Sequence, residues 1–285
     1  MTSPRDAIVL VAVDGSQESL RALPLARTIG AQLHCVPYVL HVAAAPMPTE
    51  TARAELGLDL PDLRELPLRL RIGEPADCIL EEASGPDVQL LVMTTIAAGN
   101  PERDLGSVAM RVALGTSRPI LGLRPEVGQE PSAVALPVHR LLLPLDGSHS
   151  TASAVRPATS LARRLGASVD VLYIVPPSSS SSKKQRGSIV APRYVDQPHH
   201  EWSTWENELK ERLLVESAGF SPGADVGVHV QQGQPGEEIV RFARHGRYDA
   251  VVLVRRSRLE PGRAAILRNV IQHSPCPLLI VGGPE

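Results

Sequence analysis

A short motif that occurs twice divides this chain into two comparable halves. Residues 11–16 read Val-Ala-Val-Asp-Gly-Ser, and residues 143–148 read Leu-Pro-Leu-Asp-Gly-Ser. Because a chance match does not preserve order along a chain, the segments that follow indicate a tandem duplication. These segments are 25–31 with 161–167, 73–79 with 233–239, Asp87 with Asp249, and 117–121 with 275–279.

The length and local composition predict where the two domains begin and end. With 285 residues, each copy is long enough to bury its own core. We predict a first domain over 1–125, a linker over 126–138 in a stretch rich in Pro, Gly and Ser, and a second domain over 139–285. A serine run followed by basic residues predicts a disordered insert near 176–200.

The bulk composition excludes several classes of function. The net charge of -2 argues against binding to nucleic acid or to a membrane surface. The three cysteines are far apart and form no Cys-x-x-Cys pair, so neither disulfides nor a zinc site is expected. His199 and His200 are adjacent and do not supply a metal set, and no Gly-x-Ser-x-Gly elbow is present. We expect a soluble cytoplasmic protein without a metal site or catalytic residues.

Strands and helices are expected to alternate in each half. In the first half the predicted strands are 7–13, 33–42, 66–72, 88–93 and 120–123, and the predicted helices are 20–29, 76–83 and 107–114. Gly30 is expected to end the first helix, and Pro37 to interrupt the second strand with an irregular or partly exposed stretch. The second half repeats this from residue 140, with later strands at 169–175, 226–230, 250–254 and 278–281 and a helix at 201–218. This alternation predicts an α/β fold with a doubly wound, open parallel sheet in each half.

Candidate binding residues lie where predicted strands end. Ligands of doubly wound sheets bind beyond the carboxyl ends of the strands, where both Asp-Gly-Ser turns are expected. Gly106 and Ser107 open a predicted helix whose free N–H groups are suited to a phosphate. Asp14 and Asp146 also have a purely structural interpretation, because an aspartate in such a turn can cap a helix without any ligand.

Several of these motifs together resemble the universal stress protein family. They are the Asp-Gly-Ser turn, the Gly-x-Pro at 73–75, Met93-Thr94-Thr95, the turn at 106–109 and the closing segment 273–281. The resemblance covers nearly the whole chain as two tandem copies. It implies a five-stranded, Rossmann-like sheet in each copy with strand order 3-2-1-4-5, and two copies packed as a pseudo-dimer. The last strands, 120–123 and 278–281, are then expected to meet within the chain or across a homodimer.

The resemblance also implies a nucleotide site in the first domain. Many members bind ATP through a Gly-x-x-Gly, nine residues, then Gly-Ser or Gly-Thr. Here Gly106 and Ser107 match the last pair, whereas Thr94 and Ala97 replace the first two glycines and Ile96 stands where histidine is common. A Cβ at a position where backbone should face phosphate weakens binding. ATP, with Mg²⁺, is the implied ligand, and the candidate residues are Ala12, Val13, Asp14, Val39, Met93, Thr94, Ala97, Gly106, Ser107 and Val108.

The second copy departs further from the family pattern. Ala264 and Ala265 stand where the first copy has Gly106 and Ser107, and arginines occupy the preceding loop. Asp146 and Arg256 are the only candidates for a weak nucleotide site here. These arginines form either an altered anion site or a solvated face.

Three functions follow as alternatives. The first is a ligand-sensing or adaptor protein of the stress response, with adenine nucleotide bound in the first domain and no enzymatic activity beyond slow ATP hydrolysis. The second is a ligand-free scaffold that acts through protein contacts. The third is an adenylate-forming or ATP-hydrolysing enzyme, although its usual serine-glycine-rich loop and His-x-Gly-His are missing.

Overall fold

A computed structural model describes residues 7–59, 61, 63–95, 106–124, 137–145, 155–175, 226–255 and 261–282, with the backbone alone over 261–264. The chain divides into two compact units. One comprises Met1–Val138 and Pro277–Ile280, and the other His139–Cys276 and Val281–Glu285. The predicted linker (126–138, except its last two residues), the insert near 176–200 and the helix over 201–218 lie outside the described residues.

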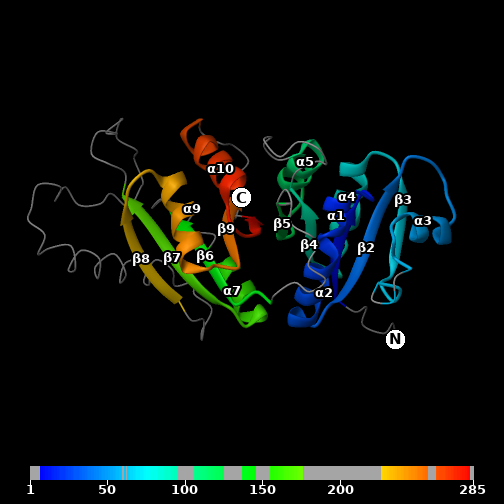
Figure 1. Cartoon of the computed structure of the whole chain (residues 1–285), viewed down its shortest axis with the longest axis horizontal. Helices are drawn as coiled ribbons and strands as arrows, with labels where there is room; N and C mark the ends of the chain where they lie inside the picture. The colour runs from blue at the N-terminus through cyan, green and yellow to red at the C-terminus, as the bar shows by residue number, and fades with distance from the viewer. Residues whose placement is uncertain are drawn as a thin grey trace, which may run out of the picture. The chain divides into compact units, whose positions relative to one another are not determined.

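The first unit is a parallel sheet with strand order β3-β2-β1-β4-β5. This order confirms the doubly wound arrangement expected for the first copy (Figure 1). Its strands are β1 (Ile8–Val13), β2 (Val36–Ala43), β3 (Leu68–Ile72), β4 (Val88–Thr94) and β5 (Ile120–Leu123). Its helices are α1 (Gln17–Leu20), α2 (Ala22–Leu33), α3 (Thr49–Glu55), α4 (Pro75–Ala83) and α5 (Ser107–Gly115).

The central strand β1 marks the place where the chain changes direction across the sheet. The chain moves from β1 to β2 on one side, and later crosses from β3 to β4 on the other side of β1. Right-handed crossovers therefore place α2 and α4 on opposite faces. All six residues of β1 are buried, as expected for a strand covered on both faces. The carboxyl ends of β1 and β4 lie side by side at this switch point.

Pro37 does not interrupt β2, but the stretch around it, Val36–Tyr38, is partly exposed, which is one of the two outcomes that the sequence predicted. It lies within the strand and pairs with Val9 of β1. In a parallel ladder, successive N–H groups point to alternate neighbours, and the Val36 N–H already donates to Ala7 of the β1 side. The missing N–H of Pro37 therefore faces the β3 side, where pairing begins only at Val39. No ladder hydrogen bond is lost.

The second unit repeats this plan. Its parallel strands follow the order β9-β6-β7-β8. These strands are β6 (Arg140–Leu145), β7 (Ser168–Val175), β8 (Val226–Gln232) and β9 (Ala250–Arg255). The described helices are α7 (Val155–Leu165), α9 (Pro235–Gly246) and α10 (Pro261–His273). Their order confirms the repeat expected from the sequence.

The closing strand β10 (Leu278–Gly282) pairs with β5. The two strands run antiparallel, with Leu278 opposite Gly122 and Ile280 opposite Ile120. The residues of β10 that pair with β5, Leu278–Ile280, belong to the first compact unit. The expectation that these strands meet is therefore confirmed within the chain. The pairing covers the edge of β5, which a soluble sheet must protect.

The sequence predicted that Gly30 ends α2, and this prediction is wrong. The helix continues to Leu33, and His34 takes the left-handed conformation with φ 54°. The N–H of His34 donates to Ala31 O, and that of Cys35 to Gly30 O at 2.8 Å, which together make a Schellman cap. A Cβ on Gly30 would lie 2.9 Å from the Cys35 carbonyl oxygen. Glycine is needed there for close approach rather than for helix termination.

The true partner of His34 in the repeat is Gly166. Gly166 has φ 69° and closes α7 with the same pair of hydrogen bonds, from Gly166 N–H to Arg163 O and from Ala167 N–H to Ala162 O. The match of 25–31 with 161–167 is therefore wrong by one helical turn. When the spacing of Asp14 and Asp146 is kept, the caps coincide and buried positions also correspond: Leu23 with Val155, Ala26 with Ala158, Ile29 with Leu161, and Leu33 with Leu165.

The segment between β2 and β3 contains a helix that the sequence prediction missed. Helix α3 has too few apolar residues for a clear period, and one arginine organises the turns that follow it. The Arg53 guanidinium donates to the carbonyl oxygens of Leu58, Arg64 and Leu66. Such long-range bonds to backbone leave no sequence pattern.

Candidate functional site

The Asp-Gly-Ser turn after β1 is a closed hydrogen-bonded unit. Asp14 Oδ1 accepts from the Ser16 N–H at 2.9 Å and from Ser16 Oγ at 2.6 Å. Ser16 Oγ in turn accepts from the Ser19 N–H at 3.1 Å and so caps α1. Gly15 takes φ 87°, which an L residue adopts only with strain. We expected Asp14 to cap the helix, but the residue that caps α1 is Ser16. Asp14 orients the side chain of that serine.

The Asp14 side chain is held as a carboxylate. Partial burial by itself would raise its pKa, but the hydrogen bonds with Ser16 and Ser19 outweigh burial, and the pKa lies below the ordinary value. The backbone N–H of Asp14 also donates to Ser19 Oγ at 3.2 Å. A fixed negative charge therefore stands at the carboxyl end of β1.

Helix α5 begins beside β4 with free backbone donors. The Gly106 N–H donates to Thr95 O at 2.8 Å, and the Met110 N–H donates to Gly106 O at 2.8 Å. Gly106 is the N-cap and makes no side-chain capping bond. The N–H groups of the first turn, at Ser107–Ala109, precede the first α-helical bond, so this end carries partial positive charge.

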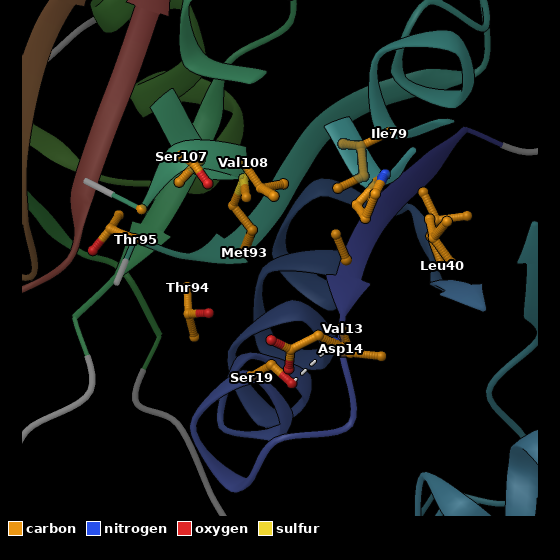
Figure 2. A pocket seen from close by; sticks show the side chains of 15 residues that line it. Val13, Asp14, Ser19, Leu40, Ile79, Met93, Thr94, Thr95, Ser107 and Val108 are labelled. Atoms are coloured by element: carbon orange, nitrogen blue, oxygen red, sulfur yellow. Dashed lines mark hydrogen bonds between the residues drawn. The ribbon is translucent and has the colours of Figure 1, made fainter. Parts of the chain in front are cut away.

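A pocket of about 250 Å³ lies between these two features (Figure 2). Apolar side chains form most of its walls, with the Asp14 turn and the start of α5 at its polar edges. Its lining residues are Ala12, Val13, Asp14, Ser19, Leu40, Val42, Pro75, Ile79, Met93, Thr94, Thr95, Gly106, Ser107, Val108 and Ala109. The fold thus brings the ends of β1, β2 and β4 together with the first turns of α4 and α5.

Most of the first-domain candidates line this pocket. They are Ala12, Val13, Asp14, Met93, Thr94, Gly106, Ser107 and Val108. Val39 is fully buried and is not a lining residue, because side chains alternate along β2 and its neighbours Leu40 and Val42 face the pocket. Ala97 lies outside the described residues.

The lining residues that the sequence analysis missed come from neighbouring elements. Pro75 and Ile79 lie on α4, and the spacing of the Gly-x-Pro motif could have placed them there. Alternation along the second strand could have selected Leu40 and Val42. Ser19 carried no distinguishing signal, since its role depends on hydrogen bonds within the folded turn.

An arginine ties the two helices that flank the pocket. Arg111 of α5 donates to Glu74 Oε2 at 2.8 Å and to Asp77 Oδ1 at 2.5 Å, both at the start of α4. Glu74 is also the N-cap of α4, since its carboxylate accepts from the Asp77 N–H. The positive charge of Arg111 is thereby neutralised by two carboxylates, and none of these three residues lines the pocket.

Thr95 fixes the end of β4 against β5. The residue is 2% exposed, and both its N–H and its Oγ1 donate to Leu123 O, at 2.8 and 3.1 Å. A Cβ on Gly122 would overlap Thr95 Cγ2. Gly122 on β5 therefore leaves the space that the Thr95 methyl group occupies.

In the second unit the corresponding helix, α10, begins at a different position in the repeat. When the two copies are aligned on their closing segments, 117–121 with 275–279, Ala265 corresponds to Ser107, the first residue of α5. The described backbone shows that α10 begins at Pro261, one helical turn before Ala265. Ala264 and Ala265 therefore lie beyond the first turn, where N–H groups are already bonded within the helix. Asp146 and Arg256, the two candidates for this copy, lie outside the described residues.

Within the part of the chain that the structure describes, no group of His, Cys, Asp and Glu side chains is arranged to hold a metal ion. No described helix is long and apolar enough to cross a membrane. His199 and His200 lie outside the described residues.

Comparison with known proteins agrees with this architecture. The model of the universal stress protein family matches residues 7–124 and again residues 137–282. The chain belongs to this family. A universal stress protein of Methanocaldococcus jannaschii is 24% identical over 154 residues, which are 51% of this chain and 83% of that protein.

Two solved structures cover both copies of this universal stress protein. A universal stress protein from Archaeoglobus fulgidus has a TM-score of 0.61 and 15% identity, over 98% of this chain and 99% of that one. A putative universal stress protein from Pseudomonas aeruginosa has a TM-score of 0.62 and 16% identity, over 98% and 94%. At these identities the likeness supports the fold, and the expected tandem organisation is confirmed by the double family match.

Proposed function

We propose that the first unit of this universal stress protein binds an adenine nucleotide, and that the protein acts as a ligand-sensing adaptor in a stress response. The observation that carries the proposal is the start of α5, which has no side-chain cap and opens onto a pocket with apolar walls. A ligand that fits has an uncharged ring at one end and an anionic group at the other. Adenine nucleotides have this form and are what the family resemblance implies.

Asp14, Gly106 and Ser107 support the proposal further. They match the family's nucleotide pattern in sequence, although they lie far apart along the chain, and all three line one pocket. A carboxylate at Asp14 is an acceptor for ligand hydroxyl groups. We propose that this site binds its ligand rather than transforms it.

Calorimetry on the full chain tests the proposal. Gly106→Asp is the sharpest variant, because an aspartate N-cap bonds the same N–H groups and stabilises the helix while excluding an anion. We expect wild-type protein to bind AMP or ATP, with and without Mg²⁺, and Gly106→Asp to lose this binding without losing thermal stability. Ser107→Ala is the comparison variant: it keeps the backbone donors of the helix start and is expected to weaken binding less than Gly106→Asp does.

A ligand-free scaffold is the second candidate, and Thr94 is the observation that favours it. Its side chain lines the pocket at a position where the family pattern has glycine. On this alternative no nucleotide binds, and Gly106→Asp leaves the cellular stress phenotype unchanged. Mass spectrometry of small molecules released from denatured protein separates the two: a nucleotide in stoichiometric amount supports the sensor.

Slow ATP hydrolysis has its own test. Phosphate release in steady state is expected to be no greater for wild-type protein than for Asp14→Ala. A rate that depends on Asp14 would assign the protein to the enzymes.

A further inference from the structure

The start of α5 is held in place by a hydrogen bond to the end of β4. The Gly106 N–H donates to Thr95 O at 2.8 Å, and the Gly106 carbonyl oxygen accepts the first α-helical bond, from the Met110 N–H. Gly106 is therefore bonded to β4 on one side and to α5 on the other. The N–H groups of the first turn, Ser107–Ala109, follow this residue directly, and the helix itself gives them no partners. Their position in the pocket thus depends on where Thr95 lies.

Thr95 is itself fixed by both branches of its side chain. Its Oγ1 donates to Leu123 O at 3.1 Å, the same carbonyl oxygen that accepts from the Thr95 N–H at 2.8 Å. The two lone pairs of a carbonyl oxygen suffice for both bonds. Its Cγ2 methyl group occupies the space beside Gly122, where a Cβ would overlap it. Any other rotamer of Thr95 would lose the hydroxyl bond and the methyl contact together.

Gly122 has no other evident advantage in its strand. A glycine within a strand weakens the strand and often marks a close approach by a neighbouring group. Gly122 is one of the four residues of β5, and it is paired with Met93 of β4 on one side and with Leu278 of β10 on the other. The neighbour that requires the missing Cβ is the Thr95 methyl group. The glycine and the threonine therefore form a matched pair.

The consequence for a ligand is confined to one edge of the pocket. Thr95 lines the pocket where β4 ends (Figure 2). A displacement of its carbonyl oxygen moves Gly106, and with it the N–H donors of the first turn of α5. Hydrogen bonds to an anion are short, about 2.7–2.9 Å, so such a displacement weakens them. The apolar walls at Leu40 and Ile79 belong to β2 and α4 and do not depend on this bond.

We propose that Thr95 is a positioning residue of this site, which sets the Ser107–Ala109 N–H groups against the anionic group of the ligand, and that Gly122 supplies the space that fixes Thr95. The inference rests on the proposed function and adds to it a strand, β5, that contributes no residue to the described lining of the pocket. The affinity for the anionic group is then determined partly behind the pocket wall.

Calorimetry with AMP and adenosine on the full chain tests this role, at a temperature below the unfolding transition of every variant. Gly122→Ala is expected to weaken AMP binding at least about tenfold, which corresponds to the loss of one hydrogen bond to a charged group. Adenosine is expected to lose less, because it carries no anionic group for α5. Adding Thr95→Ser to Gly122→Ala removes the methyl group that the new Cβ overlaps and keeps Oγ1, so AMP affinity should recover.

Two further variants separate positioning from general stability. Thr95→Val keeps the branched shape and removes the bond from Oγ1 to Leu123 O, so we expect a loss of AMP affinity smaller than that of Gly122→Ala. Gly30→Ala is the matched control, because it also forces a Cβ against a neighbour in the first unit. Gly30 lies near the end of α2, beside the start of β2 and away from the strand ends that form the pocket. It should leave AMP binding unchanged.

Each contrary result has a distinct meaning. Unchanged AMP binding by Gly122→Ala, or equal losses for AMP and adenosine, overturns the positioning role and leaves the proposed function intact. The same loss in Gly30→Ala reduces the effect to stability, and no recovery in the double variant overturns the assignment to Thr95. Equal binding of AMP and adenosine by wild-type protein overturns the placement of the anionic group at α5. Absence of binding by both compounds overturns the proposed function, and this inference with it.

Discussion

Asp14 and Ser16 are joined by two hydrogen bonds, from the serine N–H and from its Oγ to the same carboxylate oxygen at 2.9 and 2.6 Å. Because Ser16 caps α1, the charge of Asp14 stabilises the start of that helix as well as the rim of the pocket. A residue that lines a ligand site thus has a structural role that is measurable without any ligand.

Asp14→Asn is expected to reduce the free energy of unfolding at pH 7 by about 1 kcal/mol, because hydrogen bonds to a neutral amide are weaker than those to a carboxylate. The folded-state pKa is lowered, so the contribution of wild-type Asp14 is complete above its unfolded pKa of about 3.9 and is lost as pH falls through the folded pKa. Urea unfolding of both proteins between neutral and acidic pH checks this. A difference that grows as pH falls would contradict the account.

Gly122→Ala is expected to destabilise the first unit by about 1–3 kcal/mol, because its Cβ overlaps the Thr95 methyl group. Thr95→Ser removes that methyl group but keeps the Oγ that bonds Leu123 O. A double-mutant cycle by thermal unfolding should therefore show positive coupling, with the double variant more stable than the sum of the two single effects. Additive effects would mean that the clash is relieved elsewhere.

Gly30→Ala is expected to destabilise the protein, although replacing glycine by alanine within a helix usually stabilises it. Alanine favours a helix over glycine by about 1 kcal/mol, yet here its Cβ meets a backbone oxygen, that of Cys35, which cannot rotate away. We expect a net loss of stability. The matched control is Gly115→Ala in α5, whose Cβ meets only the flexible end of Leu80 and should cost less. Denaturant midpoints compare the two.

Tyr248 in the second unit provides a prediction at alkaline pH. Its hydroxyl donates to Asp170 Oδ2 at 2.7 Å, and Asp170 also accepts from Arg140 at 2.8 Å, while the Arg140 guanidinium lies 4.6 Å from the centre of the tyrosine ring. Tyr248→Phe keeps the ring and removes the hydrogen bond. The expected loss at pH 7 is about 1 kcal/mol.

The same variant has a defined pH dependence. Burial, and then the hydrogen bond and charge of Asp170, raise the pKa of Tyr248 above its ordinary value. The stabilisation by the hydroxyl is therefore complete below the unfolded pKa of about 10 and declines at higher pH, as the unfolded tyrosine ionises first. The stability difference between wild type and Tyr248→Phe should shrink above pH 10. A constant difference would show that Tyr248 does not titrate differently on folding.

Local signals in the sequence were sufficient for much of this architecture. Apolar runs placed β1 and β4, and the Gly-x-Pro motif placed the start of α4, because strand burial and proline at the first helical turn depend on few neighbours. The predicted end of α2 was wrong because His34 adopts a left-handed conformation, which a histidine in the sequence does not predict. Gly30 is fixed instead by the approach of Cys35.

The candidate site was predictable only where its residues lie next to strand ends. Asp14, Met93 and Ser107 follow from that rule. Leu40 replaces Val39 because the register of β2 decides which side chains face the pocket. The earlier start of α10 in the second unit was missed, although Pro261 stands at its first position, a place in a helix that proline favours.

We propose that duplication repeated the fold and left a nucleotide site in the first unit alone. Native mass spectrometry of the full chain with excess AMP tests it most directly. The account predicts one bound nucleotide per chain for wild-type protein and none for Gly106→Asp. Two nucleotides per chain, or one that persists in Gly106→Asp, would contradict it.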